Sequence, residues 1–384
     1  MTALFNAFAM DTSALLFFSS IAFQPSRSED FANVKISAER SGEACWKDTH
    51  WHPVLCCHPH FGPEGNADCW GGGFDARRCC DEKTWEPWRV LEFQATLCES
   101  WFARCRGKST RGSDAPATWS AGLHEELLFY FGYLRAGVGS GVPRHAREFG
   151  AALDPESPVD SRVQELLLRN ASGHPLELPA RVRLLDVGSG PFSLLGYTWP
   201  GVEVSLTAVD PLACEYGEIR RDLGVVLPAQ ALPVPGVAEH LQEALQGVGT
   251  DAFDLVHSTN AMDHSQDPAL ALAQLLRLVR PGRPLLFRHS RNEAVKNLYH
   301  GLHQWNFDLS GDGRLIAWRP EKTPGAGAGG GGGGSEVVDL EEYLASLGLV
   351  ELGASQVRVA DAWYAAPNEP SAPGARDWVE AVLW

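Results

Sequence analysis

The 384-residue chain contains no apolar run of the roughly 20 residues that a membrane-spanning helix needs, so the sequence predicts no transmembrane span. Basic side chains are scarce: 32 Lys and Arg against 48 Asp and Glu give a net charge of −16. Nucleic acids are bound through stripes of Lys and Arg that displace counterions, so this balance excludes broad nucleic-acid binding. With 44% hydrophobic and 21% charged residues, the composition is that of a globular protein. We therefore expect an acidic globular protein that acts on something small.

Two nucleotide-binding patterns are also missing. The glycine-rich run 325–335 contains no GxxxxGK[ST] phosphate loop, so we expect only a flexible surface loop there. A GxGxxG dinucleotide fingerprint that begins at Gly188 would require glycine at position 193, where the chain has Ser193. This departure disfavours a nicotinamide-dependent oxidoreductase.

Cysteine is nearly absent outside one stretch of the chain. Eight of the nine cysteines lie between Cys45 and Cys105, and the ninth is Cys214. The stretch repeats a short unit, in which Cys45-Trp46 and then Cys56-Cys57 are echoed by Cys69-Trp70 and then Cys79-Cys80. An even set of eight, in a segment with too few aliphatic side chains for a core, favours disulfides within the set. Such pairing would leave Cys214 as the one free thiol.

Metal binding is the alternative for residues 40–106, because four histidines flank the first Cys-Cys pair: His50, His52, His58 and His60. The second repeat has no histidine, and neither repeat has the CxxC knuckle of a zinc site. We therefore interpret residues 40–106 as a small disulfide-rich module with a structural or partner-binding role. It resembles short CW…CC units found in proteins of marine algae and other protists.

The first segment, residues 1–24, allows two interpretations. Its apolar stretch over residues 14–23 includes small residues that permit cleavage after Ala22, as in a secretory signal peptide. No Lys or Arg precedes this stretch, so a buried N-terminal segment of a cytosolic protein is the alternative. Because disulfides form in oxidising compartments, we favour the secretory pathway or the cell exterior over the cytoplasm.

From residue 181 onward, short apolar runs alternate with helical patterns, which predicts a parallel sheet with helices on its faces. The expected strands are 183–187, 204–209, a poorly defined one before Ala238, 253–257, 285–289 and a closing strand at 357–364. The expected helices are 123–134, 161–170, one that Asp267 caps and residues 280–282 end, and 337–347. We expect residues 117–180 to form a helical cap that contributes to substrate choice, and residues 181–384 to form the catalytic domain.

The sharpest motif is Asp186-Val187-Gly188-Ser189-Gly190, at the end of the first predicted strand. Its glycines permit a tight turn and the close approach of a ligand to the backbone. Asp210 ends the second strand, where a carboxylate can accept hydrogen bonds from both hydroxyls of a ribose. The order of these motifs predicts a nucleotide-like cofactor across the carboxyl ends of the strands.

From residue 181 to residue 319 the chain resembles the class I S-adenosylmethionine-dependent methyltransferases, especially the type 11-like group. The resemblance implies a Rossmann-like α/β fold, with a seven-stranded sheet and helices on both faces, and S-adenosylmethionine as the cofactor. It also implies the cofactor-binding residues: Asp186, Gly188 and Gly190 at the methionine end, Asp210 at the ribose, Glu239 at the adenine, and Asn260 after the fourth strand. Val237 departs from the polar residue that is common in the adenine motif.

Methyl transfer to a hydroxyl requires an aligned acceptor and removal of its proton. Histidine titrates near neutral pH, so we expect His264 or His289 to act as the base, together with Asp263. The expected acceptor-binding residues all follow strand five: Arg291, Asn292, Glu293, His303 and Trp305. We expect no metal, because a site that bridges Asp263 and Asn292 would need an acidic residue before the Asn, and none is present.

The sequence thus predicts an enzyme that transfers a methyl group to a small molecule or a glycan, at oxygen. The Cys-rich module would be an appended unit for a protein partner. The alternative is a catalytically inactive methyltransferase-like protein that binds its partner through the Cys-rich repeats. The retention of Asp186, Gly188, Gly190 and Asp210 favours the enzyme.

Overall fold

In a computed structural model the chain divides into two units, Met1–Pro87 and Trp88–Trp384. The residues that the structure describes all belong to the second unit: 98–105, 117–139, 149–297, 299, 301–320, 335–351, 355–360 and 378–384. The predicted N-terminal segment and the CW…CC repeats lie outside these residues, as does nearly all of the glycine-rich run. Within the described ranges, no helix combines the length and the apolar character needed to cross a bilayer.

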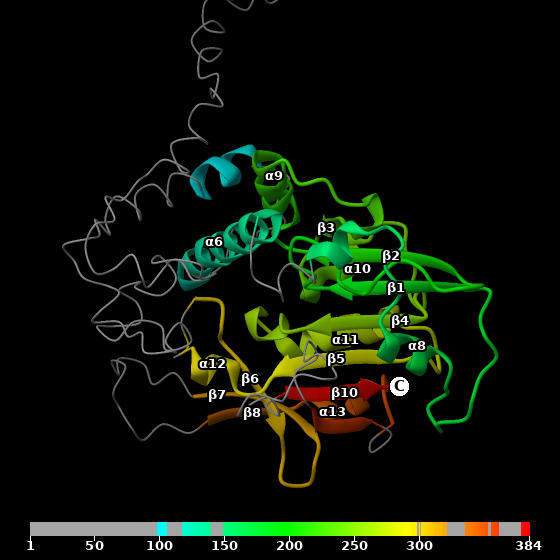
Figure 1. Ribbon diagram of the computed structural model, residues 1–384. Helices are drawn as coiled ribbons and strands as arrows, with labels where there is room; N and C mark the ends of the chain where they lie inside the picture. Colours follow the sequence, from blue (N-terminus) through cyan, green and yellow to red (C-terminus); the bar gives the residue numbers. More distant parts are fainter. Residues whose placement is uncertain are drawn as a thin grey trace, which may run out of the picture. The chain divides into compact units, whose positions relative to one another are not determined.

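A seven-stranded sheet forms the centre of the second unit (Figure 1). Its strands, in chain order, are β1 (Arg181–Val187), β2 (Glu203–Asp210), β3 (Pro233–Pro235), β4 (Leu255–Thr259), β5 (Leu285–Ser290), β9 (Gln356–Ala360) and β10 (Trp378–Leu383). Their order across the sheet is β3-β2-β1-β4-β5-β10-β9. The first five run parallel, whereas β10 is antiparallel to both β5 and β9. The predicted Rossmann-like sheet is confirmed.

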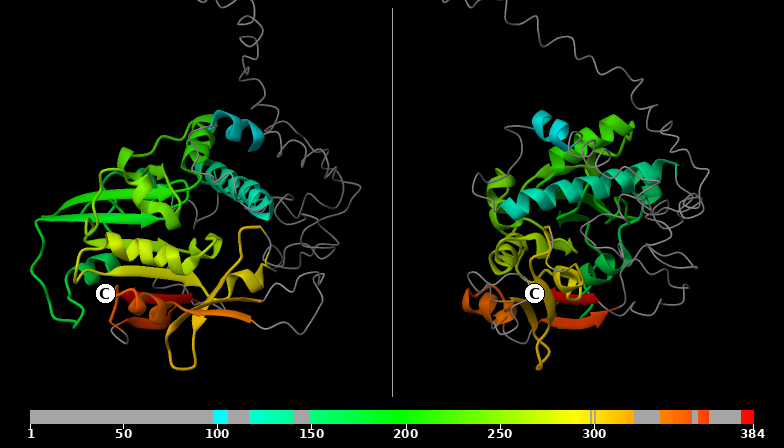
Figure 2. Two further views of the ribbon diagram at one scale, coloured as in Figure 1. Left: turned by 180° about the vertical axis from the view of Figure 1, so that it is seen from behind. Right: turned by 90° about the vertical axis from the view of Figure 1, so that its left-hand side faces the viewer.

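Helices cover both faces of this sheet (Figure 2). They are α6 (Ala117–Gly139), α8 (Ser161–Leu167), α9 (Ala213–Leu223), α10 (Leu241–Ala244), α11 (Pro268–Leu278), α12 (Glu293–Lys296) and α13 (Leu340–Ser346). Leu272 and Leu275 of α11 and Leu344 of α13 belong to the apolar core on one face. Val163 and Leu167 of α8 belong to the core on the other. The predicted helix cap is confirmed, because the Asp267 carboxylate accepts a hydrogen bond from the amide of Leu270.

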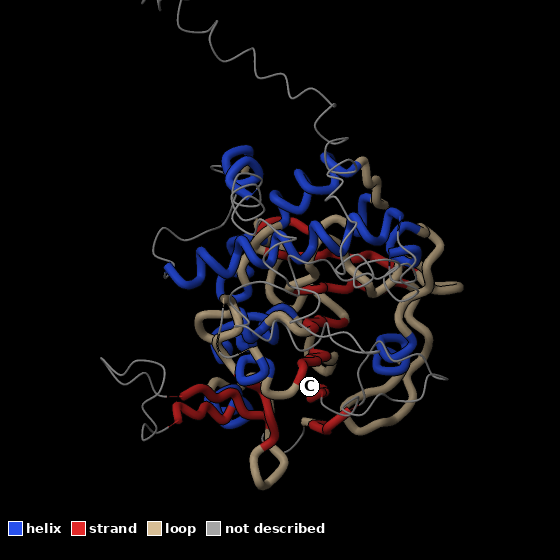
Figure 3. Tube along the Cα trace, turned by 60° about the vertical axis from the view of Figure 1, so that its left-hand side comes forward, coloured by secondary structure: helices blue, strands red, loops and turns tan. Residues whose placement is uncertain are grey.

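A second, antiparallel sheet was not expected from the sequence (Figure 3). It consists of β6 (Asn306–Leu309), β7 (Leu315–Pro320) and β8 (Ser335–Asp339). Residues 337–339 therefore belong to a strand, and the prediction of a helix from residue 337 was wrong by three residues. Helix α13 begins at Leu340 because Asp339 caps it, accepting a hydrogen bond from the amide of Glu342.

One disulfide corrects the expected cysteine pairing. Cys105, at the end of a helical segment over residues 98–104, is bonded to Cys214 at the start of α9, 109 residues away. The eight clustered cysteines therefore do not all pair among themselves, and Cys214 is not the free thiol. Cys98 is a buried free thiol instead. Burial, reinforced by the charge of Glu99, raises the pKa of this thiol to about 12.

This pairing gives a direct expectation for thiol mapping. When the unreduced protein is unfolded and alkylated, Cys98 should carry the label, whereas Cys105 and Cys214 should be recovered as one disulfide-linked peptide pair. Peptide mass spectrometry before and after reduction checks both. Label on Cys214 without reduction would contradict the disulfide.

Candidate functional site

A cavity lies at the carboxyl ends of the parallel strands, beside α6. The empty space within it, including the part open to solvent, is about 670 Å³. Among the described residues, the lining includes Leu123, Glu126 and Tyr130 of α6, Gly188 after β1, Asp210 at the end of β2, Tyr216 of α9, residues 236–239, residues 260–262, His264, Ser265 and Leu302. Ligands of open α/β sheets bind at this edge.

The turn after β1 leaves no room for side chains. Gly188 has a φ of +71°, and a Cβ there would lie 2.2 Å from the Cβ of Ala261. Gly190 has a φ of +65°, and a Cβ there would lie 2.7 Å from the hydroxyl oxygen of Tyr130. Both positions thus require glycine, for the turn and for close packing. The contact with Tyr130 also shows that α6 packs over this turn.

Asp210 lines the cavity and fixes the glycine turn. One of its carboxylate oxygens accepts a hydrogen bond from the amide of Gly190 at 2.9 Å, and the other accepts one from the amide of Leu212 at 2.8 Å. Burial raises the pKa of Asp210 to about 8, with a further contribution from the nearby Glu126, although the two amide donors oppose this rise. A buried acceptor of this kind suits a ligand that donates hydroxyl hydrogen bonds.

Asp186 is buried outside the lining that the described residues form around the cavity. One carboxylate oxygen accepts a hydrogen bond from the Ser193 hydroxyl at 2.6 Å, and the other lies 2.8 Å from His257 Nδ1. Both oxygens are therefore engaged within the protein. Ser193, the residue that breaks the dinucleotide fingerprint, thus holds the carboxylate that precedes the turn.

Glu239 and Asn260 both line the cavity, and each also supports the loops around it. A Glu239 carboxylate oxygen accepts a hydrogen bond from the amide of Gln266 at 2.7 Å, in the loop that leads to α11. The side-chain oxygen of Asn260, a residue with φ of +48°, accepts a hydrogen bond from the amide of Ser290 at 3.0 Å. This bond ties the end of β4 to the end of β5.

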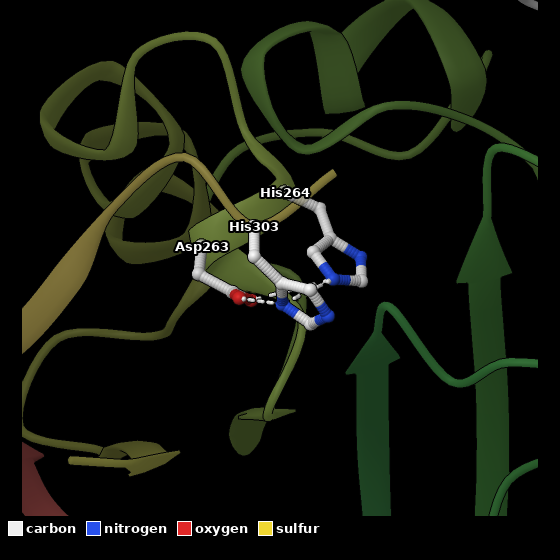
Figure 4. A group of neighbouring side chains, drawn as sticks. All are labelled: Asp263, His264 and His303. Carbon is white, nitrogen blue, oxygen red and sulfur yellow. Dashed lines mark hydrogen bonds and ion pairs between the residues drawn. The ribbon is translucent and has the colours of Figure 1, made fainter. Parts of the chain in front are cut away.

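Asp263 is the centre of a histidine cluster next to the cavity (Figure 4). Its side chain is fully buried. His289 Nε2 lies 2.9 Å from Asp263 Oδ1, and His303 Nδ1 lies 2.6 Å from Asp263 Oδ2. His264, which lines the cavity, places its Nε2 3.3 Å from His303 Nδ1. The structure therefore brings together both predicted bases, the predicted Asp, and His303, which was expected to bind the acceptor.

The electrostatics of this cluster separate its histidines. Burial is the main cause that lowers the pKa of His264 to about 4; the charge of Asp263 opposes it, and the charges of His303 and His289 add smaller lowering effects. Burial also lowers the pKa of His303, but the hydrogen bond and charge of Asp263 outweigh it and bring the pKa to about 9. Burial would raise the pKa of Asp263, yet the surrounding histidines hold it well below its ordinary value. At neutral pH, His264 is thus a neutral proton acceptor and His303 a cation paired with Asp263.

His289 is fully buried, and its second nitrogen, Nδ1, lies 2.8 Å from the carbonyl oxygen of Ser290. Both of its ring nitrogens therefore contact protein groups. Of the two predicted bases, His264 is the one that lines the cavity.

The remaining predicted acceptor-binding residues lie toward the second sheet. Arg291 and Asn292 donate hydrogen bonds to the two carboxylate oxygens of Asp308 in β6, at 2.6 and 3.0 Å. A Glu293 carboxylate oxygen accepts a hydrogen bond from the side chain of Asn297. Trp305 is buried, with the Arg319 guanidinium 4.0 Å from the centre of its ring. These contacts hold the second sheet against the region after β5.

Glu126 of α6 was missed by the sequence analysis. It lines the cavity, and it lies close enough to Asp210, Asp263 and His303 for their charges to influence one another. Burial is the main cause that raises its pKa to about 7, so that it is a proton acceptor poised near neutral pH. In the sequence, Glu126 differs from its neighbours only in lying off the apolar stripe of the helix. Because solvent-facing residues lie off the stripe as well, this position does not indicate a cavity.

Residues 156–321 match the family model described as a methyltransferase domain. The match covers less than half of the chain; together with the strand order above, it supports a methyltransferase-like fold for this region and implies S-adenosylmethionine as the cofactor. The glycine turn and the buried Asp210 carboxyl, both at the edge of the cavity, fit this cofactor. A comparison with curated protein sequences finds no match.

Several solved structures are similar to this chain, all with TM-scores below 0.5. An arsenic(III) S-adenosylmethionine methyltransferase from Chlamydomonas reinhardtii has 25% identity, with 35% of this chain and 46% of that chain covered and a TM-score of 0.23. An S-adenosylmethionine-dependent methyltransferase from Aquifex aeolicus has 14% identity, with 61% and 90% covered and a TM-score of 0.29. One from Mesorhizobium loti has 15% identity, with 54% and 93% covered and a TM-score of 0.31. The match spans less than half of the length of the algal enzyme.

Proposed function

We propose that this protein catalyses S-adenosylmethionine-dependent methyl transfer to a hydroxyl oxygen of a small molecule or a glycan. The observation that carries the proposal is the lining of a single cavity. A glycine turn and Asp210 border it, and two proton acceptors, His264 and Glu126, line it as well. A cofactor and an acceptor hydroxyl can therefore meet next to a base.

Different residues around the cavity would bind the cofactor and take up the proton of the acceptor. When bound, S-adenosylmethionine supplies a methyl group on a positively charged sulfur. Gly188 would let the cofactor approach the backbone, Asp210 would accept hydrogen bonds from the ribose hydroxyls, and Glu239, which also lines the cavity, would contact the adenine. The acceptor oxygen would gain the methyl carbon, and the electron pair of the broken bond would stay on sulfur. The hydroxyl proton passes to His264 or Glu126.

We also infer that the protein acts in an oxidising compartment, in the secretory pathway or outside the cell. The disulfide between Cys105 and Cys214 supports this inference, because such bonds persist where thiols are not kept reduced. The thiol mapping described above tests it on protein from the native source. The assignment of the CW…CC repeats to a protein partner stays a proposal.

The test of the proposed function is a transfer assay on the full-length, oxidised protein. Methyl-labelled S-adenosylmethionine is incubated with separate panels of hydroxylated metabolites, oligosaccharides, amines and thiols. We expect label on hydroxyl acceptors. Transfer to amines or thiols alone would contradict the assignment to oxygen. Tight cofactor binding without transfer to any panel would favour the inactive, partner-binding alternative.

A further inference from the structure

The cluster around Asp263 gathers three side chains of metal-binding types from two segments of the chain. Asp263 and His264 belong to a short 3₁₀ helix, Met262–His264, that follows β4, and His303 belongs to the loop before β6. One ligand atom from each residue lies within 4.8 Å of the other two. Figure 4 shows the His303 ring between the Asp263 carboxylate and the His264 ring.

The separations fit a common ion. Zinc binds imidazole nitrogen and carboxylate oxygen at about 2.0–2.2 Å, so two ligands of a tetrahedral site lie roughly 3.3–3.6 Å apart. His264 Nε2 is 3.3 Å from His303 Nδ1 and 3.7 Å from Asp263 Oδ1. The 2.6 Å contact between His303 Nδ1 and Asp263 Oδ2 is a hydrogen bond. When a metal ion replaces the proton shared by these two atoms, the distance between His303 Nδ1 and Asp263 Oδ2 would increase to that of two ligands of one ion.

The surrounding contacts hold these side chains in place. His289 Nε2 contacts Asp263 Oδ1, in the way that hydrogen-bonded partners orient metal-ligating carboxylates. The amide of Gln304 donates to the carbonyl oxygen of Asp263 at 3.0 Å, which fixes the His303 loop against the 3₁₀ helix. Gly122 of α6 packs on the same loop so closely that a Cβ there would lie 2.5 Å from the amide nitrogen of Leu302.

We propose that Asp263, His264 and His303 bind a divalent transition-metal ion of the zinc type beside the cofactor cavity. Two imidazoles and one carboxylate suit zinc, cobalt or nickel better than magnesium or calcium, which prefer oxygen ligands alone. Because His264 lines the cavity, an ion on this cluster is accessible to a ligand there. Three protein ligands leave a fourth position open, as in catalytic zinc sites.

The role of the ion rests on the proposed function, whereas its binding does not. An acceptor hydroxyl on the open position becomes more acidic through coordination. Since His264 is then a ligand, the proton passes to Glu126, and the acceptor oxygen forms its bond with the methyl carbon. In this mechanism His264 is a ligand of the metal ion, and Glu126 takes up the proton of the acceptor hydroxyl.

The experiment is a cobalt titration of the full-length, oxidised protein, followed by visible absorption. Cobalt on nitrogen and oxygen ligands gives d–d bands, whereas cobalt on any free cysteine adds thiolate charge-transfer bands, so the two kinds of site are distinguishable. We expect the wild type to bind about one equivalent more than His264→Ala or His303→Ala, and zinc to displace that equivalent. His174→Ala, which changes an exposed histidine outside the cavity, should bind like the wild type.

Equal cobalt binding and equal spectra in the wild type, His264→Ala and His303→Ala would overturn the metal site. If thermal unfolding shows that His303→Ala does not fold, the comparison with His264→Ala decides alone, because that side chain is partly exposed. S-adenosylhomocysteine binding by the metal-free wild type is measured in parallel. If the protein binds cobalt at this site but does not bind S-adenosylhomocysteine, the proposed function is contradicted and the metal site is not.

Discussion

Replacing Asp210 by Ala is expected to weaken S-adenosylhomocysteine binding by at least about 100-fold above pH 8, where this carboxylate is ionised. Hydrogen bonds to a charged group each contribute about 1.5–3 kcal/mol, and this carboxylate can accept one from each ribose hydroxyl. The substitution also removes the acceptor for the amides of Gly190 and Leu212, which loosens the turn beneath the cofactor. Isothermal titration calorimetry measures the affinity, and thermal unfolding shows whether the variant is folded.

Two comparisons make this result specific. Asp312→Ala removes an exposed carboxylate in the turn between β6 and β7 and should leave the affinity unchanged. Because the pKa of Asp210 is raised to about 8, binding to the ionised carboxylate releases a proton below that pH. Wild-type affinity should therefore increase up to tenfold per unit as the pH rises toward about 8, whereas Asp210→Asn should lack this dependence. A folded Asp210→Ala variant with an affinity within threefold of the wild type would remove Asp210 from the cofactor site.

Replacing Glu126 by Gln is expected to lower kcat by about 100-fold while S-adenosylhomocysteine affinity changes little. A positioned general base contributes roughly 10²–10⁴-fold, and Gln keeps the shape of Glu but cannot take up a proton. Single-turnover methyl transfer to the acceptor found in the panel assay measures the rate.

The control for this variant is Glu99→Gln, which changes a largely exposed carboxylate beside His124 of the same helix, α6. It should keep the wild-type kcat. If Glu126→Gln also keeps the wild-type rate, His264 remains as the base on the cavity. The assignment of the proton to Glu126 would then be wrong.

The sequence predicted the central sheet well because its strands are short apolar runs with turn residues at their ends. It missed β10, although every residue from Trp378 to Leu383 is buried and the strand pairs with both β5 and β9. A polar Glu380 interrupts the apolar pattern there, and only the folded structure shows that Arg288 and Arg358 neutralise it. The second sheet was missed because residues 321–334 separate β7 from β8 in the sequence.

Position after a strand correctly placed Gly188 and Asp210 at the cavity, and Asp263 lies next to it, although the functions assigned to these residues stay predictions. The candidate site was not predictable where the decisive partner comes from elsewhere in the chain. A helical pattern separates the polar side of α6 from its apolar side, but it does not distinguish a cavity from solvent, and so Glu126 was overlooked. The same holds for two other contacts between distant parts of the chain. The spacing of residues in the sequence does not predict that Ser193 and His257 hydrogen-bond to Asp186. Nor does it predict the disulfide between Cys105 and Cys214.

The most direct test of a methyltransferase cofactor site in this cavity is a calorimetric titration of the full-length, oxidised protein with S-adenosylhomocysteine, with NADH as the control ligand. We expect one binding site with a micromolar dissociation constant for S-adenosylhomocysteine and no heat of binding for NADH. Folded protein that binds no S-adenosylhomocysteine, or that binds NADH more tightly, would contradict the account.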